Sequence, residues 1–127
     1  MEKYLKIITS LFILALFNYN AFSQGLNAIV APDNSNIIAV GDNGKILRSS
    51  NGGTTWSRTT NGSVNFKAAS FFGNDVWAAA NDGKVYKTTK VNSPLTGYAT
   101  GSLNSINGVS FVSSTIGYAC GDDGALY

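Results

Sequence analysis

The chain has 127 residues, of which 44% are hydrophobic and 13% charged, with 14 glycines and only 2 prolines. This is the composition of one small globular domain, and it excludes a disordered or collagen-like chain. There is no histidine, which excludes Ser-His-Asp triads, Cys-His nucleophiles and His-ligated zinc. The single glutamate is Glu2, so a glutamate acid/base is excluded in the rest of the chain. A net charge of +2 without a basic stripe argues against nucleic acid as a partner. The composition indicates a protein that is not an enzyme and needs no cofactor.

Residues 1–23 have the three parts of a secretion signal. Two lysines precede an apolar run over residues 7–17, and Ala21 and Ser23 stand at the two positions that a signal peptidase reads. The apolar run has about 11 residues, against the ~20 that a membrane-spanning helix needs. The sequence therefore predicts a signal peptide cleaved before Gln24 and a protein that is secreted, periplasmic or at the cell surface, with no membrane span after cleavage.

Three segments of the remaining chain repeat one pattern, at residues 37–48, 76–87 and 117–127. Each segment is an apolar run, an Asn/Asp-Gly pair and a second apolar run, and the pairs recur about every 40 residues. Such pairs favour positive φ at both central positions of a type I′ hairpin turn. The predicted turn residues are Asn43, Gly44, Asp82, Gly83, Asp123 and Gly124.

A period near 40 residues with four short strands per unit is typical of β-propeller blades. We therefore expect an all-β fold: a partial β-propeller of about two and a half four-stranded blades from a propeller of six to eight. Blade 1 is expected at about 27–62, blade 2 at about 64–101 and the start of blade 3 at about 104–127. Since closure needs at least about four blades, the sequence predicts an incomplete propeller. Residues 24–127 are expected to be poorly soluble or to self-associate. The alternative is an ordinary β-sandwich with accidental internal similarity.

Residues 49–56 read Ser-Ser-Asn-Gly-Gly-Thr-Thr-Trp, which resembles the Asp-box, or bacterial neuraminidase repeat, with the pattern Ser-x-Asp-x-Gly-x-Thr-Trp. Asn51 stands where that family usually has aspartate. The turn follows Ser49. The side-chain oxygen of Asn51 can accept hydrogen bonds from backbone N–H groups of this turn, and Gly53 provides the backbone conformational freedom that the turn needs. We expect Thr55 to start the next strand and Trp56 to fill the gap between adjacent sheets.

The longer phrase over residues 39–56 is similar to the repeat of the photosystem II assembly and stability factor family of secreted propellers, and the resemblance covers about residues 27–127. It implies a non-catalytic scaffold for binding or assembly, with an unidentified protein or carbohydrate partner. The second copy of the box, at residues 88–95, has lost its Gly and Trp.

Sialidases that carry Asp-boxes need an arginine cluster and a glutamate-assisted tyrosine, whereas this chain has only Arg48 and Arg58. The alternative is the N-terminal part of an exported, sialidase-like glycoside hydrolase whose catalytic residues lie beyond residue 127. A third reading is a stalk for a later adhesion or sorting domain.

Two basic residues, Arg48 and Lys87, occupy equivalent places in the first two units. They could form a basic ridge for an anionic partner, although we favour solvated charges at strand ends. Cys120 aligns with Val40 and Ala79, which predicts a small buried residue.

Aromatic residues also recur at matched positions, Trp77 with Tyr118 and Tyr86 with Tyr127. We expect them to pack between blades rather than to form a sugar-stacking platform. The Asp-Asn-Gly and Asp-Asp-Gly runs are explained by turn chemistry, so no metal site is expected.

Overall fold

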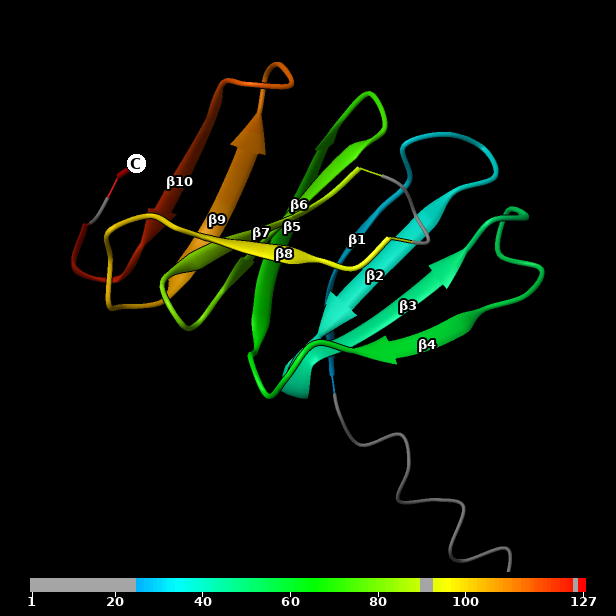
Figure 1. The fold of residues 1–127 in the computed structure, drawn as a ribbon, viewed down its shortest axis with the longest axis horizontal. Helices are drawn as coiled ribbons and strands as arrows, with labels where there is room; N and C mark the ends of the chain where they lie inside the picture. Colours follow the sequence, from blue (N-terminus) through cyan, green and yellow to red (C-terminus); the bar gives the residue numbers. More distant parts are fainter. Residues whose placement is uncertain (1–24, 90–92, 125) are drawn as a thin grey trace, which may run out of the picture.

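A computed structural model describes residues 25–89, 93–124 and 126–127. The predicted signal peptide lies outside these residues. The described chain forms three antiparallel sheets that stand side by side, with no α-helix among the described residues (Figure 1). Over the same ranges, no helix is long and apolar enough to cross a membrane.

We call the three sheets blades 1, 2 and 3. Blade 1 has the order β1-β2-β3-β4 and blade 2 the order β5-β6-β7-β8, while blade 3 pairs β9 with β10. The innermost strand of blade 2, β5, contacts both β1 and β9. The strands are β1 (Leu26–Val30), β2 (Ile37–Gly41), β3 (Lys45–Ser49), β4 (Ser57–Thr60), β5 (Phe66–Phe72), β6 (Asp75–Ala80), β7 (Lys84–Thr88), β8 (Thr96–Ala99), β9 (Ile106–Phe111) and β10 (Gly117–Gly121).

The first turn has the predicted backbone conformation, and the second does not. Asn43 (φ 53°) and Gly44 (φ 67°) are both left-handed, as a type I′ turn requires. At the second turn only Gly83 has a positive φ (75°), so a type I′ turn at Asp82 is a wrong prediction. The Asp82 carboxylate accepts a hydrogen bond from the Tyr86 hydroxyl. Asp82 keeps a negative φ, and Gly83 is the residue of this pair with a left-handed backbone conformation.

The third repeat turn lies in the short 3₁₀ segment Asp122–Gly124, where Gly124 has a φ of 71°. The Asp123 side chain lies outside the described residues. Gly44 is required by packing as well as by its backbone conformation, since a Cβ atom there would lie 2.5 Å from the carbonyl oxygens of Asn61 and Gly62.

The hydrophobic core lies between the sheets, in two clusters. The first joins blade 1 to blade 2 and contains Ile38, Val40, Ile46, Phe66, Val76, Ala78, Ala80, Tyr86 and Leu95. The second joins blade 2 to blade 3 and contains Trp77, Ala79, Val85, Ile106 and Ala119. Strands that are apolar on both faces are explained by this arrangement, because blade 2 has a neighbour on each side.

In each matched pair of recurring aromatic residues, the blade 2 member is buried and the later member is exposed. Trp77 is buried and stacks on Phe111 of blade 3, with ring centroids 3.7 Å apart and planes 9° apart. Packing between blades is therefore confirmed for Trp77. Tyr86 is also buried and meets Phe66 of its own blade edge to face. Their counterparts Tyr118 and Tyr127 are exposed.

Cys120 is exposed, so the prediction of a buried thiol is wrong. Its counterparts Val40 and Ala79 are fully buried because the next blade covers each of them. Beyond β10, the described residues form the 3₁₀ segment Asp122–Gly124, the isolated bridge between Cys120 and Leu126, and two backbone hydrogen bonds between Ala119 and Tyr127. The repeat pattern identifies the face on which a residue lies, but burial also needs a neighbouring sheet.

Candidate functional site: a cleft between blades 1 and 2

The segment that resembles the Asp-box, residues 49–56, forms a turn between β3 and β4. The Asn51 Oδ1 atom accepts hydrogen bonds from the Thr55 amide (2.9 Å) and the Ser49 hydroxyl (3.0 Å). The Ser49 oxygen in turn accepts a hydrogen bond from the Gly53 amide at 2.9 Å. The Gly52 amide donates to the Ser35 carbonyl of the same blade at 2.9 Å, so the hydrogen bonds described for this turn all lie within blade 1.

Two details of the Asp-box differ from the sequence expectation. Strand β4 begins at Ser57, two residues after Thr55. Trp56 is 45% exposed, so the prediction that it fills a gap between sheets is wrong. The Trp56 ring lies beside its own turn, where its Cζ2 atom would be 3.6 Å from a Cβ atom on Gly53. Among the described residues, no sheet covers this side of blade 1.

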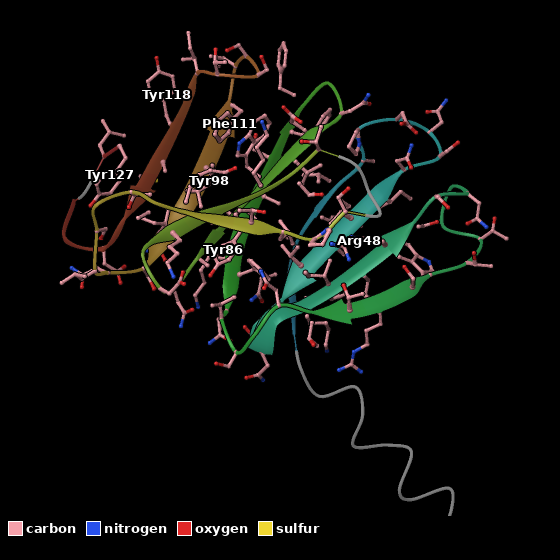
Figure 2. All side chains as sticks on the ribbon, viewed as in Figure 1. Arg48, Tyr86, Tyr98, Phe111, Tyr118 and Tyr127 are labelled. Atoms are coloured by element: carbon pink, nitrogen blue, oxygen red, sulfur yellow. The ribbon has the colours of Figure 1, made fainter. Side chains whose placement is uncertain are left out.

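Arg48, one of the two predicted binding residues, lies in a cavity. It projects from β3 between the two four-stranded blades (Figure 2) and is only 6% exposed. Its Nη1 atom donates to the Thr59 hydroxyl (2.5 Å) and its Nη2 atom to the Ser93 carbonyl (3.0 Å). A solvated charge at a strand end is therefore the wrong description of Arg48.

The cleft beside Arg48 has a volume of about 260 Å³. One wall comes from β3 and β4 of blade 1, and the other from the segment that leads into β8 of blade 2. The cleft is lined by Ile46, Arg48, Thr59, Thr60, Asn61, Ser93, Pro94 and Leu95. It combines an apolar base with hydroxyl and amide groups and one guanidinium, which is the mixture expected of a small ligand site.

The Arg48 guanidinium lacks a carboxylate partner in the described structure. Both of its hydrogen-bond acceptors are neutral oxygens, and its buried Nε atom has no partner among the described residues. Burial lowers the pKa of Arg48 from its usual value, because desolvation disfavours the charged form. A buried cation of this kind is costly unless an anionic group approaches it.

Lys87 is the equivalent residue of blade 2 and has a different environment. Its Nζ atom lies 2.9 Å from the Asp75 carboxylate and 5.0 Å from the centroid of the Trp77 ring. The register of the strands places Asn36 in blade 1 where Asp75 stands in blade 2. Asn36 instead bonds Asp33, through both its backbone amide and its side chain.

Arg48 and Lys87 therefore lie at different blade boundaries, and only Lys87 has an acid of its own. Sequence reasoning missed both the substitution of Asn36 for Asp75 and the approach of Ser93 to Arg48. Alignment of residue 36 with residue 75 in the repeat was a signal that could have identified the first. The second depends on how two blades pack, which one repeat does not encode.

A second polar cluster lies at the other end of blade 2. The Asp82 carboxylate accepts hydrogen bonds from the Tyr86 hydroxyl (2.8 Å) and from the Lys84 ammonium (3.1 Å). Burial and the Asp82 charge raise the pKa of Tyr86 to about 12. Burial alone would raise the pKa of Asp82, but the hydrogen bonds from Tyr86 and Lys84 outweigh it and lower that pKa.

This cluster offers one carboxylate locked by two donors, without the second acid that glycosidic hydrolysis requires. Over the described ranges, no group of three or more His, Cys, Asp or Glu side chains could hold a metal ion.

Three solved structures have similar folds. A structure of YCF48 bound to D1 peptide has a TM-score of 0.72 and 19% identity, over 83% of this chain and 37% of that chain. YCF48 from Cyanidioschyzon merolae has a TM-score of 0.69 and 18% identity, over 82% of this chain and 33% of that one. The WD40 β-propeller domain of Doa1 has a TM-score of 0.59 and 17% identity, over 83% and 38% of the two chains. The fold is that of a partial β-propeller.

This result confirms the predicted fold class, including the resemblance to the propeller of a photosystem II assembly factor. The chain spans 33–38% of the length of these propellers. No family model matches the chain, and no curated protein matches it in sequence.

Proposed function

We propose that the protein is an exported, non-catalytic β-propeller scaffold that binds a segment of a protein partner. The observation that carries this proposal is the buried guanidinium of Arg48, which opens onto a cleft and has neither a carboxylate partner nor a bond to its Nε atom in the described structure. A carboxylate from a partner, on an acidic side chain or at a chain end, would supply the missing charge.

The surroundings of Arg48 favour a peptide over a free ion. Thr60 and Asn61 line the cleft beside Arg48. The Asn61 side-chain amide donates to the Leu95 carbonyl at 3.5 Å, and its carbonyl oxygen can accept a hydrogen bond from a peptide backbone. Leu95 and Pro94 add apolar surface for a neighbouring side chain. One of the structurally similar propellers is YCF48 bound to D1 peptide, which supports a peptide as the class of ligand for such a fold.

The enzyme alternative has less support from the described residues. A hydrolase of the sialidase type needs an arginine cluster for the substrate carboxylate, whereas Arg48 and Arg58 are the only arginines of the chain. Arg58 is exposed on β4, and its strand partner is Leu47 rather than Arg48. Export rests on the signal pattern of residues 1–23 and is part of the proposal.

The test is a selection from a random peptide display library on the immobilised protein, followed by affinity measurements on the enriched peptides. Enriched peptides should carry an Asp or Glu, or a required free C-terminal carboxylate. Charge-assisted hydrogen bonds contribute about 1.5–3 kcal/mol, so Arg48→Gln should weaken binding by about 10- to 100-fold. Lys87→Gln is the matched control and should leave binding unchanged. Peptides that bind the Arg48→Gln variant equally well, or a selection that enriches nothing, would overturn the proposal.

A further inference from the structure

The loop between β4 and β5 begins with Asn61 and Gly62, and Asn61 lines the cleft beside Arg48. Gly62 is exposed and has a φ of 61°, and a Cβ atom on it would meet no atom within 4 Å. Among the described residues, the Gly62 amide has no hydrogen-bond acceptor. With no side chain and no bond to hold it, this amide is free to turn toward the side chain that precedes it.

Three further Asn-Gly pairs occur in the chain, at residues 43–44, 51–52 and 107–108. In the first two the glycine amide is engaged, because it donates to the Val64 carbonyl and to the Ser35 carbonyl, respectively. The third pair lies within β9, and its asparagine side chain donates to Asp122 at 2.6 Å. An N–H group that donates a hydrogen bond is held in its neutral, protonated form. Asn61 is therefore the asparagine whose following amide nitrogen is best placed to react.

We propose that Asn61 is a self-modification site whose product occupies the Arg48 cleft. The Gly62 nitrogen loses its proton and bonds the Asn61 side-chain carbonyl carbon, the Cγ–Nδ2 bond breaks, and ammonia leaves with that proton. Water then opens the five-membered imide: its oxygen bonds one imide carbonyl carbon, the bond from that carbon to nitrogen breaks, and a proton returns to the nitrogen. Opening at one carbonyl gives aspartate and at the other isoaspartate, and both leave a carboxylate at position 61. Water is the one co-reactant.

The geometry of the cleft directs this carboxylate to Arg48. Asn61 follows Thr59 by two residues and continues the strand pairing by donating its amide to the Gly44 carbonyl at 2.8 Å. The side chains of Asn61 and Thr59 therefore lie on one face, about 7 Å apart, and Thr59 accepts a hydrogen bond from Arg48. The Asn61 amide donates to the Leu95 carbonyl at 3.5 Å, and a carboxylate, which only accepts, cannot keep that bond. The guanidinium offers it a donor instead, since its buried Nε atom has no partner among the described residues.

An internal carboxylate at position 61 supplies Arg48 with the charge that the cleft otherwise takes from a partner. The protein should therefore lose affinity for acidic peptides as it ages. This consequence rests on the proposed function, whereas the modification itself does not. The reacting pair and both walls of the cleft belong to blades 1 and 2, so the site is complete within the described residues.

The first test is peptide mapping by mass spectrometry of the full chain during incubation at mildly alkaline pH. Each conversion replaces a side-chain NH₂ by OH, and position 61 should convert several-fold faster than positions 43, 51 and 107. Gly62→Ala adds a Cβ atom beside the attacking nitrogen and should suppress the conversion. Gly73→Ala is the matched control: Gly73 has a similar φ (57°) and similar open space, but it follows Phe72, so conversion at position 61 should be unchanged. If Gly62→Ala fails to fold, Asn61→Gln, which closes the imide ring much more slowly, replaces it.

The second test follows the Arg48 Nε–Hε resonance by NMR. This resonance should shift in Asn61→Asp and in incubated wild-type protein. It should stay unchanged in Asn74→Asp, which makes the same substitution at an exposed position outside the cleft. Asn61→Asp should also bind the capped peptide acetyl-Gly-Asp-Gly-amide about tenfold more weakly than fresh wild-type protein.

The outcomes separate this inference from the proposed function. Fresh wild-type protein that does not bind the acidic peptide contradicts the proposed function alone, because conversion and the Arg48 shift are measured without a ligand. Conversion at position 61 that is no faster than at position 51 would overturn the modification site. An Arg48 resonance that is the same in Asn61→Asp and in fresh wild-type protein would overturn the pairing of the new carboxylate with Arg48.

Discussion

Blades 1 and 2 have the same strand order and the same hairpins, but they treat the basic residue on their third strand differently. In blade 2, Lys87 is paired with Asp75 and lies over Trp77. In blade 1, Arg48 is more deeply buried and bonds only neutral oxygens among the described residues, while Asn36 occupies the place of the acid. The comparison shows that the same repeat position can hold a paired charge in one blade and a charge without a carboxylate partner in the other. In blade 2 the Lys87–Asp75 ion pair is structural, whereas in blade 1 the Arg48 guanidinium lies beside a cleft and has no carboxylate partner among the described residues.

The two Asp-box positions differ in a related way. In blade 1 the Asp-box-like segment keeps its Gly and Trp, its side-chain bonds lie within the turn, and Trp56 is exposed. In blade 2 the box has lost its glycine and tryptophan, and Leu95 is buried against blade 1 instead. The Ser93 carbonyl before it accepts hydrogen bonds from Arg48 and from Thr88. The degenerate box therefore takes support from the neighbouring blade and forms one wall of the cleft.

The largest expected effect is a difference in the free energy of unfolding between alanine variants of the two tryptophans, Trp77 and Trp56. Trp77→Ala removes a buried ring stacked on Phe111 and should lower the free energy of unfolding by about 3–5 kcal/mol. Trp56→Ala removes a half-exposed ring and should cost less than about 1 kcal/mol. Chemical denaturation of both variants at low protein concentration measures the difference. Equal costs would mean that Trp56 is covered in solution.

The next effect concerns the two basic residues. Lys87→Met leaves the Asp75 carboxylate without its partner and should destabilise the protein by about 1–3 kcal/mol. Arg48→Met removes an uncompensated buried charge, and the Ser93 carbonyl keeps its bond to Thr88, so the cost should stay below about 1 kcal/mol. Thermal unfolding at neutral pH compares the two variants. A larger loss for Arg48→Met than for Lys87→Met would show that Arg48 is chiefly a structural clamp.

A smaller effect should depend on pH. The pKa of Tyr86 is raised to about 12 in the folded protein, above its value of about 10 in an unfolded chain. Its contribution to stability is therefore fully present below pH 10 and is lost as the pH rises through 12. Wild-type protein should lose more stability between pH 9 and 12 than Tyr86→Phe does. Parallel curves for the two proteins would contradict the Asp82–Tyr86 bond.

The smallest effect concerns the residue that departs from the usual Asp-box. Asn51→Asp keeps an oxygen that can accept from the Thr55 amide and the Ser49 hydroxyl, and should change the free energy of unfolding by less than about 0.5 kcal/mol. Asn51→Ala removes those acceptors and should cost about 1 kcal/mol. Denaturation midpoints of the two variants test this pair, and an equal loss in both would contradict the bonding described for the turn.

The sequence predicts the fold well because the repeat, the Asn-Gly turn at residue 44 and the box are local patterns that one strand or turn expresses directly. It misjudges Trp56 and Cys120, because their burial depends on a sheet that the repeat leads one to expect beside them. It also misjudges Arg48, because its place in a cleft depends on how the Ser93 segment of blade 2 folds over blade 1. Contacts between blades, rather than within one repeat, decide the candidate site.

The most direct measurement is an NMR titration that follows the Nε–Hε resonance of Arg48, since this donor is the unsatisfied atom of the cleft. The probes are the capped peptide acetyl-Gly-Asp-Gly-amide and its Asn counterpart, which differ in the charge of one side chain. The Arg48 resonance and the amides of Thr60 and Asn61 should shift and saturate with the acidic peptide and stay unchanged with the neutral one. No shift with either peptide, or equal shifts with both, would contradict a carboxylate site at Arg48.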